Sequence, residues 1–161
     1  MRDRHLEIDL CRQILRVVER GSQLLQYNIS TSKYGPGEEV DSGCTPRGAH
    51  IIRALIGSGL PAGACFSGRR HTGEFWSQEL AEAAPERDWI LSRIIWLSGC
   101  EPGYNRLGVV DTMRRYIYIH GTPDNEPMSV PFSHGCIRLR NADVIELFDL
   151  VAVGMSVEIL A

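Results

Sequence analysis

Short apolar segments separated by turn-forming residues occupy most of the chain, and this pattern restricts the folds open to it. Residues 6–10 read Leu-Glu-Ile-Asp-Leu, which is the period-two alternation of a half-buried strand. Glycine and proline mark 30–48 as a loop and 57–74 as turns with short strands. Further strands are predicted over residues 14–18, 24–29, 50–56, 89–97, 116–120 and 156–160. The pattern predicts a mostly β domain.

Helical periodicity is strongest near the C-terminus. An apolar stripe with helical spacing is formed by Val144, Ile145, Leu147, Phe148 and Val151. Asn141 is the predicted N-cap, because its side chain can accept a hydrogen bond from a first-turn amide. Gly154 suits the end of this helix. A shorter helix is expected within residues 79–87, ending near Pro85.

Composition and charge exclude several classes of protein. The length of 161 residues fits one domain over residues 1–161, and the formal net charge of −3 argues against a basic nucleic-acid surface. No apolar stretch approaches the ~20 residues of a membrane span, and none at the start approaches the ~7–15 residues of a secretory leader. We therefore expect no nucleic-acid partner, no membrane partner and a cytoplasmic location.

The residues with the clearest chemical potential are concentrated in the segment 133–141, Ser-His-Gly-Cys-Ile-Arg-Leu-Arg-Asn. Cys136 lies close to Arg138 and to the predicted helix start, and both would favour its thiolate. Gly135 would let the backbone approach a substrate, so that successive amides point at a developing oxyanion. A small buried hydrophobe is the alternative interpretation of Cys136.

His120 is the candidate general base, at the end of the clearest predicted strand. A nucleophilic cysteine needs a base in contact with its sulfur and a third group that orients the imidazole. The backbone carbonyl of Gly121 would serve as that third group. A metal site of His120, His134 and Cys136 is the rival, but the His-x-Cys spacing is unusual for zinc and no fourth ligand is evident. We expect no metal and no cofactor.

Two motifs together resemble a known family. The segment 133–141, preceded by Ile-His-Gly-Thr at 119–122, is similar to the signature of the YkuD-type L,D-transpeptidase catalytic domain. Thr-Pro-Arg-Gly at 45–48 resembles that family's Thr-Pro-x-Gly turn, and the similarity extends over nearly the whole chain. Ser129 departs from the pattern, because the family usually has glycine there.

The resemblance implies a β-sandwich-like fold and a reaction on peptidoglycan stem peptides. Cys136 would attack the carbonyl of the third residue, D-Ala would leave, and a thioester would form. His120 would be the base and Gly121 would supply its orienting carbonyl. Amides around His134, Gly135 and Cys136 would form the oxyanion hole. Ser133 and His134 would hold the motif in shape, and Arg138 would bind a substrate carboxylate or polarise the site. Arg138 and Ser133 are therefore the expected substrate-binding residues.

Water and an amine would resolve the thioester differently. Water gives L,D-carboxypeptidation and an amine gives a cross-link. Because the chain shows no leader, we expect a cytoplasmic L,D-carboxypeptidase that removes D-Ala from tetrapeptides or muropeptides during peptidoglycan recycling. A periplasmic L,D-transpeptidase is the alternative, and a catalytically idle fragment binder or thiol sensor is a third reading. Carbapenem-type β-lactams are expected to acylate Cys136. Residues 57–88, with Arg69, Arg70 and Trp76, are the candidates for a covering loop.

Overall fold

The computed structural model describes residues 3–161 and is built mainly of strands. The strands are β1 (Arg4–Asp9), β2 (Ile14–Glu19), β3 (Ser22–Asn28), β4 (Gly48–Ile56), β5 (Ala64–Ser67), β6 (Arg70–Phe75), β7 (Ile90–Gly99), β8 (Tyr118–Thr122), β9 (Ile137–Arg140) and β10 (Ser156–Leu160). The helical elements are α1 (Gln78–Ala83), the short 3-10 segment η1 (Gly108–Val110) and α2 (Asn141–Leu150). The expected mostly β fold with one main helix near the C-terminus is confirmed.

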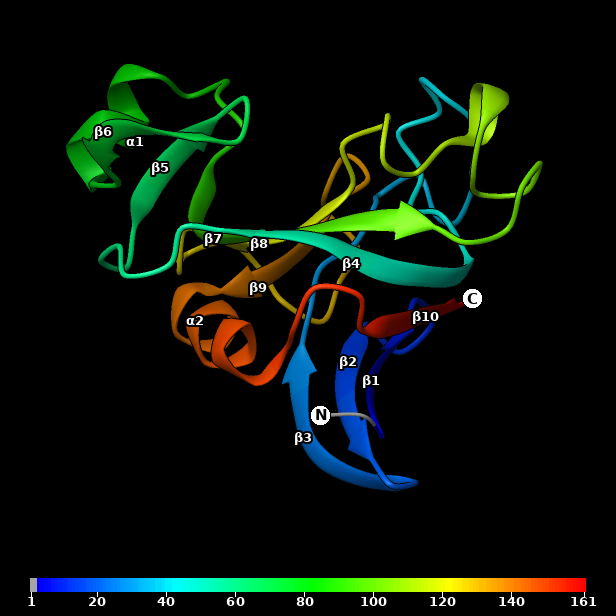
Figure 1. Cartoon of the computed structure of the whole chain (residues 1–161). Coiled ribbons are helices and arrows are strands. Elements are labelled where there is room, and N and C mark those ends of the chain that lie inside the picture. Colours follow the sequence, from blue (N-terminus) through cyan, green and yellow to red (C-terminus); the bar gives the residue numbers. More distant parts are fainter. Residues whose placement is uncertain (1–2) are drawn as a thin grey trace.

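The strands form one curled sheet rather than two separate ones. Its order is β3-β2-β1-β10-β4-β7-β5-β6, and β8 pairs with both β7 and β9. The N-terminal meander and β10 curve beneath β4, β7 and β8, and α2 packs below β9 (Figure 1). The C-terminal strand closes the curl, because β10 lies between β1 and β4. The result is sandwich-like, as the resemblance implied.

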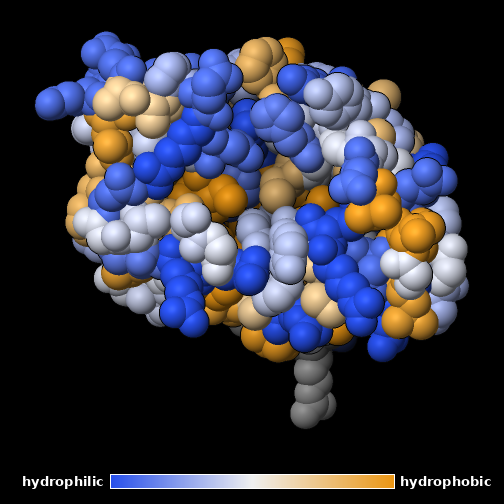
Figure 2. Space-filling model, turned by 90° about the horizontal axis from the view of Figure 1, so that it is seen from above, coloured by the Kyte–Doolittle hydropathy of each residue, from blue (hydrophilic) through white to orange (hydrophobic). Residues whose placement is uncertain are grey.

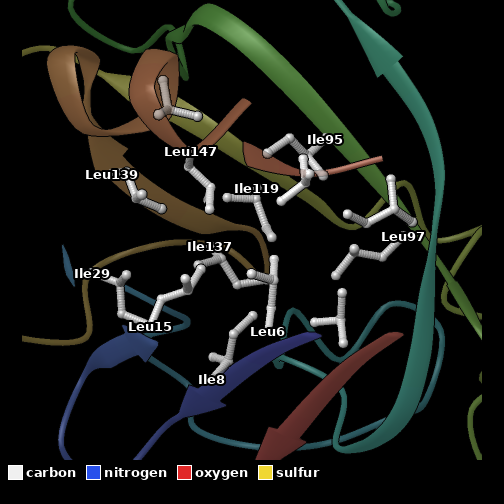
Figure 3. Packing of buried hydrophobic residues seen from close by; sticks show 14 of the residues in the cluster. Leu6, Ile8, Leu15, Ile29, Ile95, Leu97, Ile119, Ile137, Leu139 and Leu147 are labelled. Carbon is white, nitrogen blue, oxygen red and sulfur yellow. The ribbon is translucent and has the colours of Figure 1, made fainter. Parts of the chain in front are cut away.

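The main core fills the space inside the curl. It combines apolar side chains from the meander, the central strands, β10 and α2. Leu6 and Ile8 of β1 point toward Ile119 and Ile137 of the central strands, with Leu147 of α2 beside them (Figure 3). Alternation along each strand places every second side chain in this core. The residues between them point to the opposite face, where the candidate site lies.

Several predicted boundaries differ from the structure. The predicted strand 116–120 is shifted to Tyr118–Thr122, since Gly121 and Thr122 pair with β9. Strand β9 itself was not predicted, because four residues are too few for a clear period. The first helix is limited to Gln78–Ala83, shorter than expected. The β5–β6 end of the sheet rises with α1 on one side of the molecule, and the loops before β4 and β8 rise on the other (Figure 1).

Candidate active site

The parallel pairing of β8 with β9 brings the two predicted motifs together. In this register His120 lies opposite Arg138, while Ile119 lies opposite Ile137. Both isoleucines belong to the core, so His120 and Arg138 point to the outer face. Cys136 immediately precedes β9 and packs against the second apolar cluster, on this outer face. His120 and Cys136 are sixteen residues apart in sequence, and the pairing of β8 with β9 brings the segments that carry them side by side.

The thiol of Cys136 is held by backbone groups on both sides. Its sulfur accepts a hydrogen bond from the Tyr118 amide at 3.3 Å and donates to the Tyr116 carbonyl at 3.4 Å. Burial raises the pKa of the Cys136 thiol to about 12, while the Tyr118 amide and nearby arginines lower it by less. Arg138 does favour the thiolate, as expected, but the expected net lowering of this pKa is wrong. The strand β9 separates the sulfur from α2, and desolvation outweighs the nearby positive charge.

The imidazole of His120 is positioned as a neutral base. Its Nδ1 lies 2.7 Å from the Gly121 carbonyl oxygen. A carbonyl can only accept, so Nδ1 carries the proton and Nε2 keeps a lone pair. Burial lowers the pKa of His120, which keeps the ring uncharged. Within residues 3–161 no hydrogen bond joins this ring to the Cys136 thiol, so the base assignment stays a prediction.

The turn ahead of Cys136 is stabilised by its own side chains. Ser133 Oγ donates to the Cys136 carbonyl at 2.6 Å and accepts from the Gly135 amide at 3.3 Å. Gly135 has a φ of 129°, a conformation that disfavours residues with a Cβ. The Thr45 hydroxyl donates to the Gly135 carbonyl at 2.9 Å. Because the Gly135 amide is used within the turn, the amides of His134 and Cys136 remain as donors for the predicted oxyanion hole.

Arg138 already has protein partners. Its guanidinium donates to Asp88 at 2.9 Å, and its side chain is only 8% exposed. A second hydrogen bond, at 3.4 Å, goes to the Phe132 carbonyl. Sequence reasoning missed Asp88, since nothing local links it to the motif fifty residues later. Because Arg138 is paired and Ser133 is buried, both side chains are better suited to holding the motif in position than to the predicted contact with substrate. His134, in contrast, is exposed.

Asn141 does not cap α2, contrary to prediction. The N-cap residue is Arg140, without a side-chain hydrogen bond. The Asn141 amide instead donates to the Thr122 carbonyl at 3.0 Å and accepts from the Ser92 hydroxyl at 2.5 Å. A Cβ at Gly121 would lie 2.6 Å from the Asn141 Oδ1, so only glycine fits beside this bridge. Asn141 therefore ties the strand that carries His120 to β7 and to the helix.

Two hollows adjoin the site and meet at His134. One, of about 200 Å³, is lined by Glu86, Asp88, Glu126 and Arg138 among others. The other, of about 310 Å³, lies between residues 40–43 and 114–117. Seen from above, the molecule is hollowed, with apolar side chains at the floor and hydrophilic ones around it (Figure 2). The two hollows reach the candidate site at His134, Arg138 and Tyr116, and neither is lined by Cys136 or His120.

Among residues 3–161, no cluster of three or more His, Cys, Asp or Glu side chains is arranged to hold a metal ion. None of the helices in the described part of the chain is long and apolar enough to cross a membrane.

Curated proteins share a short segment with this chain. The probable L,D-transpeptidase YbiS of Escherichia coli strain K12 is 46% identical over 46 residues, which are 29% of this chain and 15% of that protein. The probable L,D-transpeptidase ErfK/SrfK of Salmonella typhimurium strain LT2 is 50% identical over 46 residues, with the same 29% and 15% coverage. The match therefore spans a small part of these relatives.

Solved structures share the fold over the whole chain. An L,D-transpeptidase from Mycobacterium smegmatis has a TM-score of 0.57 at 16% identity, covering 99% of this chain and 59% of that one. L,D-transpeptidase 3 from Mycobacterium tuberculosis, in complex with a faropenem-derived adduct, has a TM-score of 0.60 at 13% identity, covering 99% and 60%. A model of the L,D-transpeptidase catalytic domain family, YkuD, matches residues 3–159. The chain belongs to the YkuD family of L,D-transpeptidase catalytic domains.

Proposed function

We propose that this protein is a cysteine-dependent acyl-transfer enzyme acting on peptidoglycan stem peptides, with L,D-carboxypeptidation as its main reaction. The observation that carries the proposal is the shared outer face of β8 and β9. There His120 lies on β8 and Cys136 immediately precedes the neighbouring strand β9, with the imidazole oriented by Gly121. Membership of the YkuD family supports the same chemistry.

The first step is transfer of the acyl group to sulfur. As the S–C bond forms, the thiol proton passes to Nε2 of His120, and the tetrahedral oxyanion is stabilised by the turn amides. The C–N bond to D-Ala then breaks, and the imidazolium gives its proton to the departing amine. Because the resting thiol is protonated and bonded to the Tyr116 carbonyl, it must turn toward His120 as substrate binds.

The second step resolves the thioester. Water activated by His120 adds to the carbonyl, the C–S bond breaks, and the sulfur recovers a proton, giving tripeptide and the free enzyme. Hydrolysis needs no second peptide site, so water is the acceptor whenever no amine is bound. We further propose that the protein works in the cytoplasm on tetrapeptide or muropeptide fragments, without a cofactor. Fractionation of the native host would test this location, and recovery with the periplasm would overturn it.

Periplasmic cross-linking is the second candidate function. The hollow beside Arg138 is lined by Glu86, Asp88 and Glu126, whose carboxylates suit an acceptor amine. The curated relatives are named probable L,D-transpeptidases, which points the same way. In that case a second stem peptide would replace water as the acceptor.

Product analysis separates these functions. Purified protein is incubated with a disaccharide-tetrapeptide, with and without excess acceptor stem peptide, and products are identified by mass spectrometry. We expect tripeptide and D-Ala, and no turnover by Cys136→Ala, whereas Cys11→Ala, at an exposed turn, keeps full turnover. Dominant cross-linked dimers would favour the transpeptidase. Binding without D-Ala release would refute the enzyme and favour the idle binder.

Carbapenem acylation provides an independent check. One solved structure that shares this fold is an L,D-transpeptidase in complex with imipenem. We propose that a carbapenem likewise acylates Cys136, because it presents a strained carbonyl with a carboxylate nearby. Intact-mass spectrometry should show one adduct in the native chain and none in Cys136→Ala. No adduct at millimolar drug would count against an accessible nucleophile.

A further inference from the structure

Arg138 and Arg115 lie close enough to Cys136 for their charges to act on its thiol, and a third arginine, Arg69, contacts Tyr118 and Tyr116. Arg138 is paired with Asp88 at 2.9 Å. Arg115 donates to the carbonyl of Cys44 at 2.6 Å and is half-buried against that loop. Both guanidiniums therefore stabilise the walls of the site. The third arginine has a different environment.

Arg69 lies in the tight turn of the β5–β6 hairpin and reaches over the site. Its guanidinium donates to the Tyr118 hydroxyl at 3.0 Å. It also lies 4.5 Å from the centre of the Tyr116 ring and 5.1 Å from that of Trp96. These partners are neutral, and no carboxylate in residues 3–161 forms a salt bridge with Arg69. The arginine is thus held in place with its charge uncompensated.

The residues that hold Arg69 also flank the sulfur. The amide of Tyr118 and the carbonyl of Tyr116 are the two backbone groups bonded to the Cys136 thiol. Their side chains carry the guanidinium on the same outer face. Trp96 is fixed in turn by a hydrogen bond from its indole to the Met113 carbonyl at 3.2 Å. A ligand reacting at the sulfur would therefore meet Arg69 within a short distance.

We propose that Arg69 and the Tyr118 hydroxyl form a carboxylate subsite for the stem peptide, built on the rings of Tyr116 and Trp96. A guanidinium binds a carboxylate through two parallel hydrogen bonds. The Tyr118 oxygen accepts from Arg69, so its own O–H is available as a further donor. The aromatic platform restricts the arginine, which reduces the entropy lost on binding. This inference rests on the proposed function and adds the group that selects its substrate.

Two carboxylates of the substrate could bind at this subsite. One is the C-terminal carboxylate of the leaving D-Ala, which lies one residue, at most about 3.6 Å of chain, beyond the scissile carbonyl. The other is the free carboxylate on the side chain of the diamino acid that is acylated. Amidation removes the charge of either group without removing the rest of the residue. Substrates amidated at one position at a time therefore distinguish the two sources.

The test compares Arg69→Gln with the native protein on three tetrapeptides. One has both carboxylates free, one ends in D-alaninamide, and one carries an amidated diamino acid. Release of the last residue is followed by mass spectrometry to give kcat and KM. Arg70→Gln is the matched control, since Arg70 is the exposed next residue, at the start of β6. Arg69→Lys keeps the charge but loses the fork geometry, and thermal unfolding checks that all variants fold.

We expect Arg69→Gln to lower kcat/KM on the free-acid peptide by about 10- to 100-fold, mainly through KM. Arg69→Lys should recover part of this loss, and Arg70→Gln should show none. The native protein should lose a similar factor on one amidated peptide, and on that peptide Arg69→Gln should cause no further loss. That peptide identifies the carboxylate that is bound.

Equal losses of Arg69→Gln on all three peptides, or no loss on any, would overturn the subsite while leaving the proposed function intact. If a folded Arg69→Lys protein behaves like the native one on all three peptides, a positive charge alone is sufficient. That result would overturn the proposed pair of parallel hydrogen bonds from the guanidinium. A native protein that cleaves none of the peptides would refute the proposed function, and the subsite with it.

Discussion

The pH dependence of Cys136 reactivity is the most direct test of the site's electrostatics. Burial raises the pKa of this thiol to about 12. At pH 8 about one molecule in 10⁴ would carry the thiolate, compared with about a quarter for an ordinary cysteine of pKa ~8.5. A more basic thiolate is also more nucleophilic, which recovers roughly 30-fold. We therefore expect Cys136 to react roughly 10²-fold more slowly than an ordinary thiol at pH 8.

The assay uses a small neutral disulfide, bis(2-hydroxyethyl) disulfide, and measures labelling of each cysteine by peptide mass spectrometry. Because the raised pKa favours the protonated thiol, the rate at Cys136 should rise about tenfold per pH unit from pH 7 to 10 without levelling off. Cys11 is exposed and serves as the internal control. In urea, where burial is lost, Cys136 should level off above its ordinary pKa.

A plateau below pH 8 in the folded protein would refute this reasoning. It would mean that the thiolate and a protonated His120 already exist as an ion pair in the resting enzyme. The same conclusion would follow if Cys136 reacted faster in the folded protein than in urea at pH 7. Either result would restore the activated thiolate expected from the sequence.

Two substitutions test the groups around the motif. Asp88→Asn leaves the buried Arg138 without its carboxylate at 2.9 Å, and should lower the free energy of unfolding by about 1–3 kcal/mol in urea denaturation. It should also move the Cys136 labelling profile to lower pH, because the negative charge of Asp88 raises that pKa; an unchanged profile would contradict this cause. Asn141→Asp keeps a capping side chain but removes the donor to the Thr122 carbonyl, so a loss of about 1–2 kcal/mol is expected in the same assay. A variant as stable as the native protein would instead support the N-cap interpretation.

Local patterns were sufficient for most of the secondary structure. Alternation along residues 6–10 and the apolar stripe of α2 depend only on which side chains face a core, and that information is local. The motif 133–136 and the His120–Gly121 pair could likewise be found by residue type and spacing. The hydrogen bond from His120 Nδ1 to the Gly121 carbonyl has the form predicted for an oriented base.

Long-range packing decided the rest. Strand β9 is four residues long and exists because it pairs with β8, so no periodicity in the sequence marks it. Asn141 has a capping residue type, but the nearby Thr122 carbonyl and Ser92 hydroxyl compete for its side chain. Such partners come from distant parts of the chain and cannot be read from neighbouring residues.

The electrostatics of the site show most clearly the difference between local sequence information and long-range packing. Residue types and their spacing establish that a cysteine, a histidine and an arginine are available, and that a glycine turn precedes the cysteine. The folded arrangement adds that Arg138 is neutralised by Asp88, that Arg69 reaches the sulfur's neighbours and that the thiol is desolvated. The physical reason is that desolvation and charge pairing depend on the three-dimensional surroundings of a group, whereas sequence specifies only the group itself.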